Sequence, residues 1–146
     1  MTWLLYPLAV AAGLAAPVQF AVNSQLRNYV GGPVAAAAIS FLVGSVVLVV
    51  AAAPTVGRIH AGRVAGAPWW VWTGGLLGAA YVVSSIVLTP RLGAGTTVVL
   101  FIAGNLLGSI LLDQFGLLRL PVHHTGWPQM LGAALVLVGA VLVQRY

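Results

Sequence analysis

The chain has 146 residues, of which 61% are hydrophobic and 5% are charged, with a formal net charge of +5. A soluble domain carries about 25% charged residues, so this composition excludes a soluble globular fold, and its high apolar content excludes intrinsic disorder. The positive charge reflects six basic residues against one acid, Asp113, rather than a basic patch that could bind nucleic acid. The absence of cysteine excludes disulfide and thiol chemistry.

Charged residues divide the chain into five long charge-free stretches, each able to hold the ~20 apolar residues that cross a ~30 Å hydrocarbon core. The stretches are longer than the ~10-residue alternating strands of a membrane barrel, and they are apolar on all sides, which indicates helices. We therefore predict an all-α polytopic integral membrane protein with a single five-helix transmembrane domain over residues 1–146. The spans are expected near 3–22, 34–53, 69–89, 95–113 and 127–144.

Glycine and proline residues stand where these spans should begin and end. Residues 31–33 (Gly-Gly-Pro) separate the first two spans, Pro54 closes the second, and Pro68 and Pro90 bracket the third. Residues 121 and 128, both proline, flank the last turn before the fifth span. Pro17 lies inside the first span, where a membrane helix tolerates proline, and its bend is either functional or harmless. The first span lacks a basic flank and a clear cleavage site, so we expect it to be retained rather than removed as a signal peptide.

Arginine residues are balanced between the two sides of the membrane that five spans define. Arg58, Arg63 and Arg119 fall on the side of the N-terminus, whereas the other three arginines, at 27, 91 and 145, fall on the opposite side. Orientation follows an asymmetry of Lys and Arg, which this chain lacks. The balance favours insertion in both orientations. The alternative is a weak bias from the N-terminal amine and His60, His123 and His124, which would place the N-terminal side inside.

Tryptophan is distributed unevenly, in contrast to arginine. All five tryptophans fall at span ends on the N-terminal side, namely Trp3, Trp69, Trp70, Trp72 and Trp127. Tryptophan concentrates at membrane–water interfaces, so an interfacial belt is the favoured interpretation. An aromatic cage for a cation is the alternative.

Polar residues inside the spans are the main functional signal, because polar groups are costly in hydrocarbon. They recur at four-residue steps, which places them on one helix face. The predicted substrate- or pore-lining residues are Gln19, Asn23, Arg27, Tyr81, Ser85, Asn105, Ser109 and Asp113. Small residues that let helices approach closely are predicted to pack helices: Gly44, Gly74, Gly78, Gly104 and Gly108. The alternatives are that the polar groups only hold helices together, and that Arg27 and Asp113 extend separately to water.

No catalytic, metal or cofactor site is expected. The nucleotide-binding glycine loop requires a lysine, and the chain has none. The three histidines have no carboxylate close in sequence except Asp113, which does not favour a metal site. The chain is therefore not expected to be an enzyme or to hydrolyse ATP.

Several motifs resemble one family of small membrane proteins. They are Pro17-Val18-Gln19 with Asn23, Leu26 and Arg27; residues 39–44 (ISFLVG); residues 74–79 (GGLLGA) with Tyr81-Val82; residues 90–94 (PRLGA); Asp113 with residues 115–117 (FGL); and residues 131–133 (LGA). In this order they resemble the YdcZ-like proteins of the drug/metabolite transporter superfamily over nearly the whole chain. The sequence departs from that pattern at two positions: it has Asn105 where the family usually has Gln, and Gln114 where the family often has His. The resemblance implies one half of a ten-helix fold of two inverted five-helix repeats.

The combined prediction is a secondary transporter of a small solute across the bacterial inner membrane. It would act by alternating access as an antiparallel, dual-topology homodimer in membrane lipid, with its site between inverted repeats. Inverting one protomer would bring its Asp113 to the level of Arg27 in the other. The alternative function is a non-transporting membrane subunit that packs against and regulates a larger complex.

Overall fold

A computed structural model describes residues 3, 5–58, 61–119, 122 and 126–145, and every regular element in these ranges is a helix. Among them, five helices are long and apolar enough to cross a membrane: Leu5–Val30, Pro33–Gly57, Trp69–Leu92, Ala94–Phe115 and Trp127–Arg145. The predicted all-α, five-span architecture is therefore confirmed. The helices form two compact parts, one ending at Arg91 and one beginning at Leu92. The single domain and the ten-helix assembly stay predictions.

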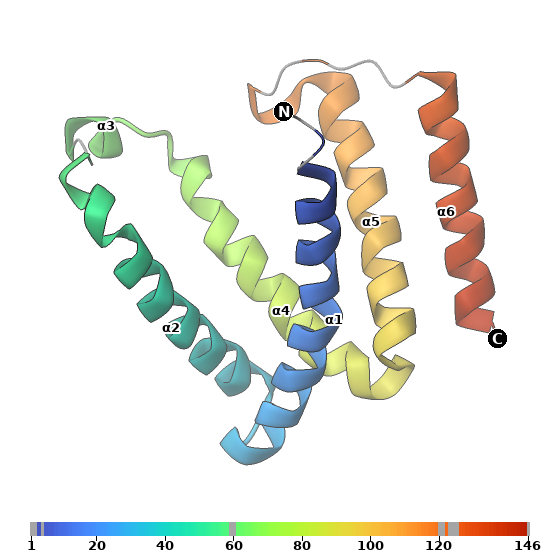
Figure 1. Cartoon of the computed structure of the whole chain (residues 1–146), viewed down its shortest axis with the longest axis horizontal. Helices are drawn as coiled ribbons and strands as arrows, with labels where there is room; N and C mark the ends of the chain where they lie inside the picture. Colours follow the sequence, from blue (N-terminus) through green and yellow to red (C-terminus); the bar gives the residue numbers. More distant parts are fainter. Residues whose placement is uncertain (1–2, 4, 59–60, 120–121, 123–125, 146) are drawn as a thin grey trace. The chain divides into compact units, whose positions relative to one another are not determined.

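The first part contains three long helices, α1 (Leu5–Val30), α2 (Pro33–Ala52) and α4 (Thr73–Leu92). Helices α1 and α4 run in the same direction and α2 runs in the opposite one (Figure 1). Short elements connect α2 to α4: η2 (Ala53–Arg58), α3 (Ala61–Ala65) and η3 (Trp69–Trp72). This arrangement places the polar faces of α1 and α4 within one three-helix unit.

The first helix is longer than the sequence predicted. The expected span ends at residue 22, whereas α1 continues to Val30. Polar residues such as Asn23 do not stop a helix. The helix ends at the glycine pair, where Gly31 has a φ of 84°. There the amide of Gly32 donates a hydrogen bond to the carbonyl of Arg27 at 3.1 Å. Because of this extension, Asn23 and Arg27 lie on the same continuous helix as Gln19.

The second part consists of α5 (Ala94–Phe115), η4 (Leu117–Arg119) and α6 (Trp127–Arg145). Helices α5 and α6 pack against each other and run in opposite directions (Figure 1). Gly93 alone separates α4 from α5, and its φ of 85° is a conformation that favours glycine. The predicted limits of the last two spans agree with α5 and α6 to within two residues.

The buried apolar core of the first part is small. It consists of Ala36 and Ala37 from α2 with Val82 and Ile86 from α4, and Leu26 of α1 packs against them. Most large apolar side chains are exposed instead; for example, residues 46–50 of α2 are each 62–70% exposed. An apolar outer surface of this kind is suited to lipid rather than water.

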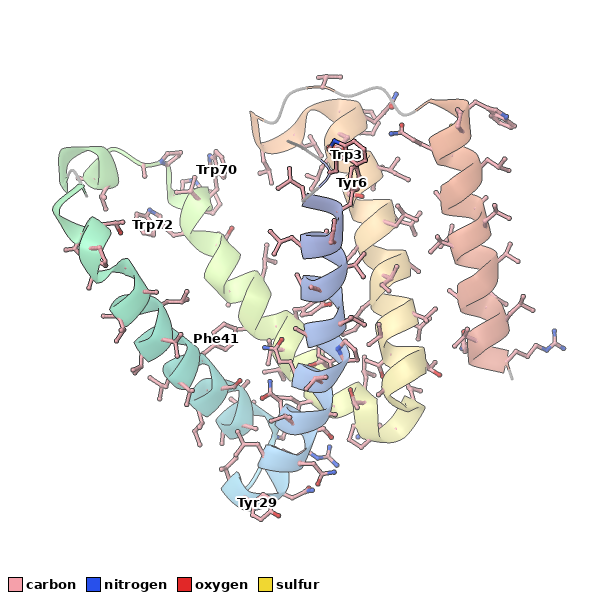
Figure 2. The ribbon with its side chains drawn as sticks, in the orientation of Figure 1. Trp3, Tyr6, Tyr29, Phe41, Trp70 and Trp72 are labelled. Atoms are coloured by element: carbon pink, nitrogen blue, oxygen red, sulfur yellow. The ribbon has the colours of Figure 1, made fainter. Side chains whose placement is uncertain are left out.

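The tryptophan side chains lie at helix ends, as the belt interpretation requires. Trp3, Trp69, Trp72 and Trp127 are each at least 61% exposed. Within the first part, Trp3 at the start of α1 lies at the same end as Trp70 and Trp72 before α4 (Figure 2). Their role as an interfacial belt stays a prediction.

Candidate functional site

Helix α1 presents its three polar residues to different surroundings, although they share one face. Asn23 is 3% exposed and Arg27 is half-buried, whereas Gln19 is exposed. Gln19 lines a shallow pocket between α1 and α2, together with Ser40, Phe41, Gly44, Ser45 and Leu48. Burial therefore distinguishes Asn23 from Gln19, which the four-residue spacing could not do.

Arg27 connects α1 to α4. Its Nη1 donates a hydrogen bond to the carbonyl of Ile86 at 3.4 Å. That carbonyl lies four residues before Pro90, which is inside α4 and has no N–H to donate to it. The Arg27 guanidinium thus satisfies the carbonyl that the proline leaves without its helical partner.

A contact between two rings and a pocket define how α1 faces α4. The rings of Phe20 and Tyr81 lie 5.8 Å apart between centroids, with their planes tilted by 59°. A second pocket lies between the helices, lined by Ala21, Val22, Ser24, Gln25, Thr89 and Pro90. The residues around Asn23 therefore stand opposite the end of α4 that contains Thr89.

Two buried polar atoms in this region lack a partner. Neither Nδ2 of Asn23 nor Oγ1 of Thr89 has a hydrogen-bond partner among the residues that the structure describes. By contrast, the fully buried Ser85 donates its hydroxyl to the carbonyl of Val82 at 2.8 Å. Such atoms are rare in a packed interior, since buried polar groups are normally hydrogen-bonded.

Thr89 was missed in the sequence prediction, together with Ser24 and Gln25. A signal for Thr89 was present, because it continues the Tyr81–Ser85 stripe by one more step of four residues. Its position beside Pro90 suggested only a helix end, whereas α4 continues through the proline to Leu92.

A third pocket lies between α5 and α6 in the second part and has a volume of about 390 Å³. Its walls are Leu106, Ser109, Ile110 and Asp113 from α5 and Gln129, Gly132, Ala133 and Val136 from α6. The structure thus brings Ser109 and Asp113 together, whereas Asn105 is exposed outside this pocket.

Hydrogen bonds orient two of the polar side chains in this α5–α6 pocket. The Ser109 hydroxyl donates to the carbonyl of Leu106 at 2.9 Å, and Gln129 Oε1 accepts from the amide of Gly126 at 3.0 Å. Gln129 was also missed; the available signal was a polar residue in the first turn of an otherwise apolar span. The pocket combines one carboxylate with a hydroxyl and an amide, a set that can hold a proton or a cation.

The glycines predicted to pack helices differ in their surroundings. A Cβ at Gly78 would meet the ring of Phe41 at 3.8 Å, and Phe41 extends from α2 toward α4 in Figure 2. At Gly44, Gly74, Gly104 and Gly108, no neighbouring atom of the described chain lies within 4 Å of such a Cβ. Their packing role stays a prediction.

Two other sequence predictions lie beyond what the structure describes. His60, His123 and His124 fall outside the described residues. Within those residues, no group of three potential metal ligands occurs. The pairing of Arg27 with Asp113 of a second copy also stays a prediction.

The fold and these sites define a small polytopic membrane protein with polar groups buried among its membrane-crossing helices. Residues 4–142 match the sequence model of the family described as "Putative inner membrane exporter, YdcZ". The chain belongs to this family and is an inner-membrane protein, and the family description is that of a transporter rather than an enzyme.

One curated relative is the inner membrane protein YdcZ of Escherichia coli (strain K12). It is 39% identical over 77 residues, which are 53% of this chain and 51% of the relative. The chain thus spans about half the length of this relative in the match. No solved structure matches the chain.

Proposed function

We propose that the chain is a secondary transporter that exports a small solute across the inner membrane. Export agrees with the family description. The transporting unit would be an antiparallel homodimer, and the solute would be released by alternating access, with its site near the middle of the membrane.

The observation that carries this proposal is the pair of buried polar atoms without a partner at Asn23 and Thr89. Polar groups inside a membrane are costly and mark solute pathways by default. A subunit that only packs against other proteins could contact them through the apolar faces of its helices. Side chains that do no more than hold helices together would have hydrogen-bond partners, whereas these two atoms lack the kind of partner that the buried Ser85 hydroxyl finds in the Val82 carbonyl of its own helix. Transport is therefore favoured over the role of a non-transporting subunit.

The antiparallel dimer is supported by the balanced arginines and the confirmed number of spans. Five spans place the termini on opposite sides, and three arginines then fall on each side. Orientation depends on an excess of Lys and Arg on one side, so two copies can insert in opposite directions. Such a pair has the inverted symmetry typical of many secondary transporters.

Transport is tested with the purified full chain in proteoliposomes. A panel of labelled short-chain carboxylates, amino acids and amines is offered, and flux is compared with protein-free vesicles. We expect at least one solute to move at least tenfold faster with the protein, and Asn23→Leu to remove most of this flux. Thr55→Val, which changes an exposed residue in η2, is the control. If folded protein moves no member of the panel, the proposal is contradicted.

A further inference from the structure

We propose that the α5–α6 pocket binds a primary alkylammonium ion, with the charged nitrogen at Asp113 and the apolar tail toward Leu106 and Val136. The pocket lies within the second part of the chain, so this inference goes beyond the proposed function and does not rest on it. Three observations carry it: the order of the lining residues along the two helices, the hydrogen-bonding capacity of the polar ones, and the size of the pocket.

The polar and apolar residues of the pocket are separated along its length. Helices α5 and α6 pack against each other in opposite directions (Figure 1), so the last turns of α5 lie beside the first turns of α6. Asp113 and Gln129 come from these adjoining ends, and Ser109 is one turn from Asp113 on the same face. Leu106 and Val136 lie about two turns further along their helices. The pocket therefore has a polar end and an apolar end, which matches an amphipathic ligand.

The polar end offers hydrogen-bond acceptors and a negative charge. An ionised Asp113 side chain only accepts hydrogen bonds. The Ser109 hydroxyl gives its proton to the Leu106 carbonyl at 2.9 Å, so its oxygen keeps the capacity to accept. An alkylammonium group carries three N–H donors and one positive charge, as a lysine side chain does. Its hydrogen bonds to a carboxylate are charge-assisted, which makes them stronger than neutral ones.

The charge of Asp113 is not balanced by any described residue that lines the pocket, because the other lining residues are uncharged. An acidic side chain inside a membrane span normally pairs with another group or marks an ion or substrate pathway. An anionic ligand would be repelled by Asp113, and a neutral one would leave the charge uncompensated. A cation is attracted, and the low dielectric of the membrane interior strengthens that attraction.

The size and walls of the pocket favour an organic cation over a metal ion. Its volume of about 390 Å³ falls within the range of roughly 300–1,000 Å³ that is typical of sites for small organic molecules. Much of the wall is apolar and comes from Leu106, Ile110, Ala133 and Val136. The part of the chain that the structure describes holds no group of three potential metal ligands. An alkyl tail, in contrast, gains free energy by leaving water for such a wall.

Binding is tested on the detergent-solubilised full chain by equilibrium dialysis with labelled butylamine, butyramide and butyrate. Butylamine is protonated at neutral pH, as lysine is, and protein-free micelles give the background. We expect butylamine to bind at least tenfold more tightly than butyramide, and butyrate not to bind. Ethylamine, which has two fewer methylene groups, should bind about tenfold more weakly than butylamine. Equal binding of butylamine and butyramide, or of butylamine and ethylamine, overturns the inference.

A first substitution tests the charged end of the pocket. Asp113→Asn removes the negative charge at nearly constant shape, and we expect it to weaken butylamine binding at least tenfold. Asn105→Ala changes a polar residue of the same helix that lies outside the pocket, and it should leave butylamine binding unchanged. Butylamine binding that is unaltered in Asp113→Asn overturns the inference.

A matched pair of substitutions in α6 tests the space for the ligand. A Cβ at Gly132 or at Gly139 would meet no atom of the described chain within 4 Å, so the fold should tolerate a side chain at either position. Only Gly132 of the two lines the pocket. We expect Gly132→Leu to fill the pocket and weaken butylamine binding at least tenfold, and Gly139→Leu to leave it unchanged. Equal effects of the two substitutions overturn the inference, and circular dichroism checks that both variants keep their helices.

Discussion

At the scale of single residues, Arg27 has a structural role that its four-residue spacing from Asn23 did not predict. It donates to the Ile86 carbonyl, whose normal helical donor would be the amide of residue 90, a proline. A hydrogen bond from a charged group stabilises a fold by about 1.5–3 kcal/mol. At 3.4 Å we expect a contribution at or below the lower end of that range.

The first prediction concerns this hydrogen bond. Arg27→Met should lower the free energy of unfolding by about 1 kcal/mol, because the Ile86 carbonyl loses its donor. Pro90→Ala supplies the missing amide, so in that background Arg27→Met should cost much less. The measurement is a double-mutant cycle from denaturant titrations in mixed micelles. Arg91→Met, at an exposed neighbouring arginine, is the control. Equal costs of Arg27→Met in both backgrounds would show that the two residues are not coupled.

The second prediction concerns Asp113, the only carboxylate side chain of the chain. It lines the α5–α6 pocket, and acidic side chains inside membrane-spanning segments are typical members of proton relays. Asp113→Asn should abolish the dependence of solute flux on a pH gradient, while exchange down a solute gradient continues. Flux into proteoliposomes with and without the gradient measures this. Asn105→Ala, on the same helix but outside the pocket, should retain the dependence. Retention in Asp113→Asn would mean that Asp113 does not couple transport to protons.

At the scale of elements, the turn between α4 and α5 depends on Gly93. It is the single residue between the two helices, and its φ is 85°. With a ψ of 154°, this positive-φ backbone is essentially restricted to glycine, and a side chain there costs roughly 1–3 kcal/mol. The turn is therefore sensitive to the loss of this glycine, although no neighbouring atom fills the space beside it.

The third prediction tests this turn with a matched pair of substitutions. Gly93→Ala should lower the free energy of unfolding by about 1–3 kcal/mol. Gly95→Ala, two residues later in α5 with open space around it, should raise it by about 0.5–1 kcal/mol, because alanine favours a helix. Denaturant titration followed by circular dichroism provides both values. A stabilising effect of Gly93→Ala would contradict the positive φ at this position.

At the scale of the whole molecule, the proposed dimer depends on the absence of a charge bias. Three arginines on each side of five spans give no Lys/Arg asymmetry that would favour one orientation. The proposal therefore requires both orientations in one membrane, and each must contribute one half of the transporting unit.

The fourth prediction removes this balance. Adding three arginines to the C-terminus should force one orientation and reduce transport at least tenfold. An N-terminal extension with the opposite charge bias should force the other orientation and should also reduce transport at least tenfold. Expressing the two variants together should restore transport. Orientation is measured with a water-soluble thiol reagent on single cysteines, since the chain has none of its own. The antiparallel dimer is refuted if either variant, present in one orientation only, transports alone.

The sequence by itself determined the five membrane-crossing helices, because a membrane helix satisfies its own backbone hydrogen bonds and needs only a long apolar run between breakers. Pro33 and Trp127 accordingly begin helices close to where the pattern placed them. The extension of α1 to Val30 was missed, because the predicted span stopped at residue 22 although the next breakers are Gly31 and Gly32. The four-residue spacing predicted that Ser109 and Asp113 share a helix face.

Only the tertiary structure decided which polar residues are buried together. Gln19 and Asn23 are equivalent by spacing, yet one is exposed and the other almost fully buried. Burial depends on where α4 crosses α1, and this crossing is fixed by contacts between residues about sixty positions apart, such as Phe20 with Tyr81. The positions of Thr89 and Gln129 in pockets could not be predicted for the same reason. Each pocket is lined partly by residues of a second helix, whereas the helical period relates only residues within one helix.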